Sequence, residues 1–484
     1  MLIIQSLKKP WDSSEIFLLL IWLFAFVLGI LGIVYSPLLF LLGILLITST
    51  LLTWKFMIPI LIFLPAILPF QPALNPSSDF DLASGRVVIL FLASIAFFYV
   101  LYKKISWFCL SNTTIFILLF LAWSVFGSIV AVDQERFLRK ILVYLSIFPI
   151  YFLLLTFLKK FNQWEKLFSF WSWSAFLVAL IGLTQFASQF VLGREVFFKF
   201  WGKIIAPILY GSNAGEAIVS NPSWFVGTGS GDLLRAISTF PDPHMLAFYL
   251  GMSLPIQVAL IVRRKSSKFF WLIPGVSLLT LLLTFSRGSY VGLAGVLLWL
   301  FLKLPKLSKF RSYAFKGALV GFIFIFSALF IAPLRERFVS ILDVSEGSNL
   351  GRLEIWNDSF EVISKNPILG VGLGNYAFAV RPESKLREPI YAHNTYLDIA
   401  SEEGLVGLSI WIIIVLPSLF PLFQNNCFSH QNFLKTAISL SVLWFSLHAF
   451  FETPLFSPQI LPLFITLIAF GVFDTKGAMR SESD

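Results

Sequence analysis

The sequence predicts an all-α polytopic membrane protein with about 14 transmembrane helices, within a range of 12 to 14. Hydrophobic residues make up 57% of the 484 residues and charged residues only 13%, whereas about a quarter of the residues in soluble domains are charged. Uncharged runs long enough to cross a hydrocarbon layer about 30 Å thick recur along the whole sequence. The short segments of alternating polarity that mark an outer-membrane β-barrel do not occur.

The predicted spans are expected to be helices, because backbone groups in lipid must find their hydrogen-bond partners within the segment. They cover approximately residues 16–35, 37–53, 56–70, 87–102, 113–130, 141–158, 167–190, 244–262, 269–285, 289–302, 315–333, 404–423, 434–450 and 455–473. The third and tenth spans are short, so either is open to a tilted or re-entrant interpretation. The first apolar run follows a lysine pair and has no small-residue cleavage site, so we interpret it as a membrane helix and not as a signal peptide.

Basic residues predict the orientation of these spans. With the N-terminus inside, cytoplasmic loops and ends hold 20 of the 36 lysines and arginines. The short outside loops hold five, namely Arg86, Arg136, Arg139, Lys140 and Arg287. The positive-inside rule therefore places both termini in the cytoplasm. The net charge of +10 reflects this topology, and no nucleic-acid partner is expected.

The predicted topology divides the chain by two long extracytoplasmic loops. Transmembrane helices occupy residues 1–190, and the loop at 191–243 follows them. Its glycines and serines favour a mobile lid or linker. Residues 244–473 hold the remaining spans and the second loop at 334–403, and residues 474–484 form a cytoplasmic tail.

The second loop contains a predicted amphipathic helix of about four turns at residues 351–365. Ser348 or Asn349 is expected to cap its start, and Asn366-Pro367 to end it. The apolar face, expected to lie on the membrane surface or on the helix bundle, has the 3.6-residue period of a helix. It consists of Leu353, Trp356, Phe360 and Ile363.

Three arginines on the outer side are candidate ligands for an anionic substrate. Arg287 lies between two adjacent spans, where an ionised group is costly and a functional role is favoured. Arg235 and Arg352 lie in the two long loops, and guanidinium groups bind phosphate oxygens through paired hydrogen bonds. The alternatives are contacts with lipid headgroups for Arg287 and Arg235, and a salt bridge within the amphipathic helix for Arg352.

His393 is the candidate general base, since an imidazole titrates near neutral pH and can take a proton from a hydroxyl. It precedes Asn394, Tyr396 and Asp398 where the chain returns to the membrane; the alternative is a structural, hydrogen-bonded histidine. We interpret the other histidines, His244, His430 and His448, as structural.

Other motifs in the sequence do not indicate cofactor chemistry. The Gly370-Val-Gly-Leu-Gly374 run lacks the βαβ context of a nucleotide loop, so we expect it to form a turn between two helices or to let the backbone pass closely under a ligand. No metal-ligand spacing appears, and Cys109 and Cys427 lie at predicted cytoplasmic ends, where no disulfide framework can be built from them.

These segments resemble the O-antigen ligase and polymerase family of bacterial membrane glycosyltransferases, most specifically over residues 270–415. The matching pieces are Ser286-Arg-Gly-Ser-Tyr-Val-Gly-Leu293, Gly351-Arg352 with Trp356, Asn366-Pro-Ile-Leu-Gly-Val-Gly-Leu-Gly-Asn-Tyr376, His393-Asn-Thr-Tyr-Leu397 and Glu403-Gly-Leu-Val-Gly407. The five pieces occur in the family's order, and all are predicted to lie outside. Fourteen spans exceed the twelve typical of lipid A-core ligases, which favours a polymerase or a general surface-glycan ligase.

The resemblance implies transfer of a glycan from an undecaprenyl-diphosphate carrier to an acceptor at the outer face of the bacterial cytoplasmic (inner) membrane. The acceptor is a glycan, a lipid or a protein. His393 would act on the acceptor hydroxyl, and Arg287, Arg352 and Arg235 would hold the diphosphate. The resemblance implies neither a cofactor nor a metal. The alternatives are a transporter or flippase for a lipid-linked or anionic solute, which should place charge near the bilayer midplane, and a membrane scaffold.

Overall fold

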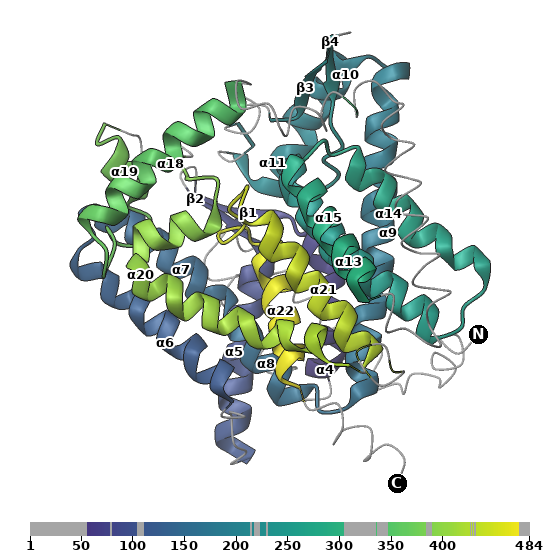
Figure 1. Ribbon diagram of the computed structural model, residues 1–484, viewed down its shortest axis with the longest axis horizontal. Helices are drawn as coiled ribbons and strands as arrows, with labels where there is room; N and C mark the ends of the chain where they lie inside the picture. The colour runs from purple at the N-terminus through teal and green to yellow at the C-terminus, as the bar shows by residue number, and fades with distance from the viewer. Residues whose placement is uncertain are drawn as a thin grey trace.

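The computed structural model describes residues 56–77, 80–103, 111–212, 215–216, 223–228, 231–303, 335, 347–383, 390–425, 427, 429 and 432–473. These residues form a bundle of helices with two small β-hairpins (Figure 1). Within the described part, five helical segments are long and apolar enough to cross a membrane: residues 112–129, 134–157, 161–191, 243–263 and 395–423. The mostly helical class predicted from the sequence is thereby confirmed, and the five apolar helices fit a membrane protein, while the number of spans stays a prediction.

The N-terminal part of the bundle follows the predicted spans closely. Its helices are α4 (Met57–Ile67) with η2 (Leu68–Phe70), α5 (Ser84–Lys103), α6 (Asn112–Phe126) with η3 (Gly127–Ile129), α7 (Gln134–Ile147), α8 (Pro149–Phe157) and α9 (Phe161–Val191). The hairpin of β1 (Ala73–Ser77) and β2 (Phe80–Ala83), which the sequence did not predict, connects the first of these to α5. The predicted spans at 16–35, 37–53 and 315–333 lie outside the described residues.

The C-terminal part contains three of the four site residues predicted from the sequence, namely Arg287, Arg352 and His393. Its elements are α13 (Pro243–Arg263), η5 (Lys268–Trp271), α14 (Leu272–Leu282), α15 (Arg287–Lys303), α18 (Gly347–Lys365), α19 (Tyr376–Val380), α20 (Thr395–Val415), η7 (Leu416–Phe423), α21 (Phe433–His448) and α22 (Leu461–Val472). α13 and α15 both pack on α21, and α20 packs on α6 (Figure 1). The two parts of the chain therefore share one bundle.

Small residues allow the helices around α21 to approach closely. A Cβ added to Gly251 of α13 would lie 1.8 Å from the indole nitrogen of Trp444, and one added to Gly292 of α15 would lie 3.2 Å from the same ring system. Trp444 is itself buried. Glycines thus make room for one large side chain between three helices, a packing common in membrane bundles.

The described part of the 191–243 loop is folded rather than extended as a linker. It contains α10 (Arg194–Phe200), a π-helical turn η4 (Trp201–Ile205), α11 (Ala206–Tyr210), and the antiparallel pair β3 (Phe225–Thr228) and β4 (Gly231–Leu234). A separate hydrophobic cluster holds these pieces together, formed by Phe197, Ala206, Trp224, Leu234 and Ile237. We call this part the outer lobe.

The amphipathic helix forms as α18, but one detail of its prediction is wrong. Its described part begins at Gly347, so the expected caps Ser348 and Asn349 lie inside it. The residues buried against the bundle are Ser359 and Val362, whereas Leu353 and Phe360 are 42% and 57% exposed. The expected contact of the apolar face with the membrane surface stays a prediction.

Candidate active site

His393 is held at the start of α20 by a carboxylate from another part of the chain. Its Nδ1 lies 2.8 Å from Oε1 of Glu452, in the short connection between α21 and α22. The hydroxyl of Thr395 donates to the carbonyl of Glu452, and the Thr395 N–H donates to the carbonyl of Ala449, each over 2.8 Å. These bonds fasten the beginning of α20 to the α21–α22 connection, so the distance between the imidazole and the carboxylate is fixed by the fold.

The backbone around His393 is tightly determined. Asn394 caps α20 by accepting hydrogen bonds from the N–H groups of Tyr396 and Leu397. On the other side of His393, the Ala392 carbonyl accepts from the indole of Trp356 over 3.0 Å. His393 has a φ of 49°, a left-handed conformation that is uncommon for a side chain of this size and clusters at functional sites.

Two more cationic or titratable groups approach the second oxygen of Glu452. Nη2 of Arg352, on α18, and Nε2 of His244, at the start of α13, each lie 4.0 Å from Oε2. Burial works against ionisation of Glu452, but His393, His244 and Arg352 together lower its pKa below the ordinary value. In return, the charge of Glu452 outweighs burial and raises the pKa of His393 above 6.5. The carboxylate therefore makes His393 a stronger base.

A second group of polar side chains continues from His244 into the protein. Nδ1 of His244 lies 3.0 Å from the hydroxyl of Ser286, and that hydroxyl lies 3.2 Å from Nε2 of His448. Gly288 leaves space for the His448 ring, because a Cβ there would lie 2.4 Å from it. We interpreted both histidines as structural from the sequence. The structure places them in one hydrogen-bonded series that begins beside Glu452, and their structural role stays an interpretation, while His430 lies outside the described residues.

Arg235 and Arg287 meet at the turn before α15, which comprises residues 284–287. Nε of Arg235 donates to the Thr284 carbonyl over 2.7 Å, and its Nη1 donates to the Ser223 carbonyl of the outer lobe over 3.0 Å. Arg287 is the first residue of α15 and only 4% exposed, as is Arg235. Phe285 within the turn has a φ of 50°. Side chains covered by protein to this extent do not fit the headgroup interpretation of the two arginines.

All four site residues predicted from the sequence thus lie at one end of the bundle, in two groups. His393 and Arg352 surround Glu452, and Arg235 and Arg287 occupy the 284–287 turn. His244 connects the groups through its contacts with Glu452 and Ser286. The placement of these segments on the outer side stays a prediction.

Glu452 is the central residue that sequence reasoning missed. It lies in the four residues between the last two predicted spans, on the same predicted side as His393. An isolated carboxylate in so short and apolar a connection was the available signal. Its partner could not be deduced, because 59 residues separate Glu452 from His393.

The glycine run at 370–374 forms the turn between α18 and α19, as expected. Gly370, Gly372 and Gly374 all have positive φ, and a Cβ on Gly372 would lie 2.6 Å from the Cβ of Ala131. The N–H groups of Val371 and Gly372 donate to carbonyls of α20. The run is therefore a close backbone contact between the α6–α7 connection and α20. Among the described residues, no three His, Cys, Asp or Glu side chains are grouped as metal ligands.

Comparison with known families agrees with the resemblance drawn from the sequence. Residues 273–412 match the model of the O-antigen ligase family. The match includes Arg287, Arg352 and His393, and it ends before Glu452. It supports an O-antigen ligase or polymerase type of glycosyltransferase in a multi-pass bacterial inner membrane. No curated protein matches the chain.

Proposed function

We propose that the protein transfers a glycan from an undecaprenyl-diphosphate carrier to a hydroxyl of an acceptor, at the outer face of the cytoplasmic membrane. The observation that carries the proposal is the contact between His393 and Glu452, beside Arg352 and at the same end of the bundle as Arg235 and Arg287. A base of raised pKa next to several guanidinium groups suits a reaction that moves one proton and releases an anion.

His393 is the proposed general base. With Nδ1–H donating to Glu452, the tautomer that leaves Nε2 unprotonated is favoured, and Nε2 accepts the proton of the acceptor hydroxyl. The imidazole is 37% exposed, so an acceptor can reach it. The hydroxyl oxygen then forms a bond to the anomeric carbon, while the bond from that carbon to the diphosphate oxygen breaks with its electron pair.

The arginines are the proposed ligands of the departing diphosphate. Negative charge grows on the leaving oxygen as its bond to the sugar breaks, and placed cations stabilise that charge. Arg352 lies on the His393 side of His244, and Arg235 and Arg287 lie on the Ser286 side. A diphosphate between them would have its phosphates near cations and its sugar near His393.

Genetic complementation tests this function. A strain lacking its surface-glycan transferase is given the wild-type protein or His393→Ala, and displayed glycan and carrier-linked glycan are both measured. We expect His393→Ala to reduce transfer by about 100-fold or more and to accumulate carrier-linked glycan. Lys365→Ala, on the exposed end of α18 where the lysine pairs with Glu361, is the control and should display normal glycan. Full display by His393→Ala at equal expression would refute the base assignment.

A further inference from the structure

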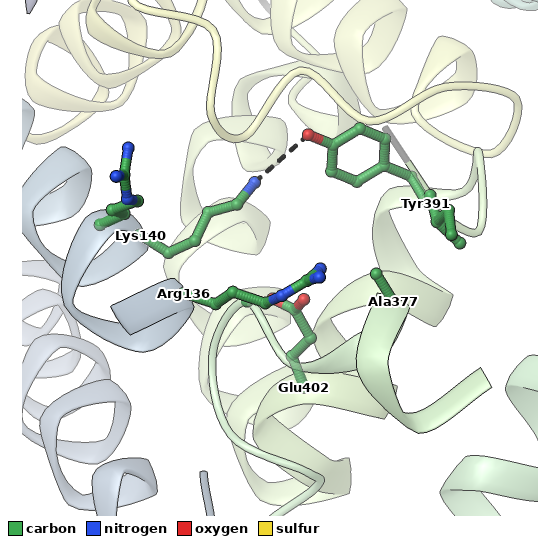
Figure 2. A pocket seen from close by; sticks show the side chains of 8 residues that line it. Arg136, Lys140, Ala377, Tyr391 and Glu402 are labelled. Carbon is green, nitrogen blue, oxygen red and sulfur yellow. Dashed lines mark hydrogen bonds between the residues drawn. The ribbon is translucent and has the colours of Figure 1, made fainter. Parts of the chain in front are cut away.

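A pocket between α7, α19 and the beginning of α20 is lined by three cationic side chains of α7. Its lining consists of Arg136, Arg139, Lys140, Gly374, Ala377, Ile390, Tyr391 and Glu402. Figure 2 shows the side chain of Lys140 pointing toward the hydroxyl of Tyr391. The three cations belong to α7, outside the residues that match the family model, whereas the facing wall belongs to that region.

The pocket is preformed by close packing. Asp133 caps α7 by accepting from the N–H groups of Glu135 and Arg136, and the side chain of Asn375 bonds the Asp133 N–H over 2.8 Å and its carbonyl over 3.2 Å. Gly374, with a φ of 79°, lets the chain pass so near that a Cβ would lie 2.8 Å from the Arg136 carbonyl and 2.9 Å from Cγ of Lys140. The first turns of α7 are therefore fixed against the α18–α19 turn.

The carboxylates around the pocket already have partners. Asp133 pairs with Arg136 at 2.9 Å, and Glu135 pairs with Arg139 at 2.7 Å. Glu402 is buried and accepts from the Tyr376 N–H over 3.4 Å.

Lys140 differs from the two arginines, since in the part of the chain described no carboxylate forms a salt bridge with it. Its ammonium lies 3.5 Å from the Tyr391 hydroxyl and 3.4 Å from the centre of the Phe456 ring. Cation–π and hydroxyl contacts hold the ammonium in place, and the carboxylates of Glu402 and Asp398 interact with it electrostatically without forming a salt bridge. The pocket thus presents a positioned cation beside an aromatic hydroxyl.

The position of Lys140 connects the pocket to the proposed base. Tyr391 precedes His393 by two residues, and Phe456 follows Glu452 by four. The ammonium therefore contacts the chain on both sides of the His393–Glu452 pair. The arginines proposed for the diphosphate lie in the segment between β4 and α13, on α15 and on α18, whereas this pocket is formed on α7. A ligand here would contact Tyr391, two residues before the proposed base.

From this arrangement we infer that the α7 pocket binds an acidic sugar of the acceptor, with Lys140 on its carboxylate and Tyr391 against the sugar ring. The inference rests on the proposed function, because it makes the group beside His393 an acceptor. It also locates acceptor choice in residues outside the family-matched region. Lys140 is then a specificity residue, and a neutral sugar would lack the interaction that selects for binding.

A binding measurement tests the pocket without requiring turnover. The full chain in phosphatidylcholine nanodiscs is titrated with methyl glucuronide and methyl glucoside, which differ in a carboxylate and a hydroxymethyl group, and binding is followed by saturation-transfer NMR. We expect the wild type to bind the glucuronide about tenfold more tightly, as one charge-assisted contact provides. Lys140→Gln should abolish this preference, Lys140→Arg should retain most of it, and Lys199→Gln, an exposed lysine of α10, should leave it unchanged.

Each remaining outcome supports or overturns the assignment of the α7 pocket to an acidic sugar. Equal binding of the two glycosides by the wild type, or a preference that survives in Lys140→Gln, would overturn the inference. The titration is repeated with phosphatidylglycerol in the nanodisc: if Lys140→Gln changes only the retention of that lipid, the pocket is a headgroup site and the glycan assignment fails. If the glucuronide preference depends on Lys140 but His393→Ala displays normal glycan, the pocket stands and the transferase mechanism fails.

Discussion

The arginines on the two sides of His244 are held in different ways. Arg235 and Arg287 are 4% exposed and sit at a turn with a left-handed residue, Phe285, where Arg235 bonds backbone carbonyls of two segments. Arg352 is 21% exposed and approaches Glu452 from a helix whose outer face is open. The first pair is fixed by the fold before any ligand arrives. Arg352 and His393 are the more exposed residues of the candidate site.

Substitution of lysine for arginine should reduce transfer most at Arg287. Lysine keeps the charge but cannot reproduce the planar fork of donors, and a buried position leaves it no room to find another geometry. We expect Arg287→Lys to reduce transfer by about 100-fold, measured as displayed glycan at equal protein level. Retention of near-normal transfer would mean that Arg287 does not contact the diphosphate.

Removing the negative charge of Glu452, which contacts His393, Arg352 and His244, should reduce transfer to an intermediate extent. In Glu452→Gln, the amide no longer raises the pKa of His393, so the base becomes weaker and transfer falls by about tenfold. Because His393 acts when deprotonated, the rate rises with pH through its pKa. That rise should therefore occur at lower pH in Glu452→Gln than in the wild type. An unchanged or upward-shifted rise in the pH profile of purified enzyme would contradict the assigned pairing.

The smallest loss of transfer is expected for substitution of Arg352, which is the most exposed of the three arginines. Arg352→Lys keeps a cation beside Glu452, and a lysine at this partly exposed position can adjust its position. We expect a loss of only about threefold to tenfold, measured with the same transfer assay. A loss as large as that of Arg287→Lys would show that both arginines act as fixed forks and would remove the distinction between them.

Much of the fold could be predicted because its signals are local. Hydropathy located most of the long described helices, and the period of residues 351–365 indicated α18, whereas α10, α11 and α19 lie in predicted loops. The packing face of α18 could not be predicted, since Ser359 and Val362 are buried by segments distant in sequence. The order inside the 191–243 loop was missed for the same reason: its small core joins residues from Phe197 to Ile237.

The candidate site was predictable in part. Arg287, Arg352 and His393 stood out because charge or imidazole is rare in so apolar a chain, and they fall within the family match. Glu452 and Ser286 did not stand out, because their importance depends on contacts across 59 and 162 residues, to His393 and His448 respectively. No period or motif encodes such pairings. Lys140 was counted only as a topological charge, although its surroundings differ from those of the other outside cations.

The backbone break at Gly404, where φ is 71° and ψ is 179°, has a consequence for how α20 enters the bilayer during synthesis. Before it lie Asp398, Glu402 and Glu403, and after it residues 405–423 carry no charge. In a straight helix, each carboxylate taken to mid-membrane would add about 3 kcal/mol to the cost of insertion. The break lets the turn that contains Glu402 and Glu403 pack inside the protein, where Ser124 donates to Glu403 over 2.6 Å. The translocon can thus insert an uncharged segment alone, and the part of α20 that begins beside the base can fold onto α6 afterwards.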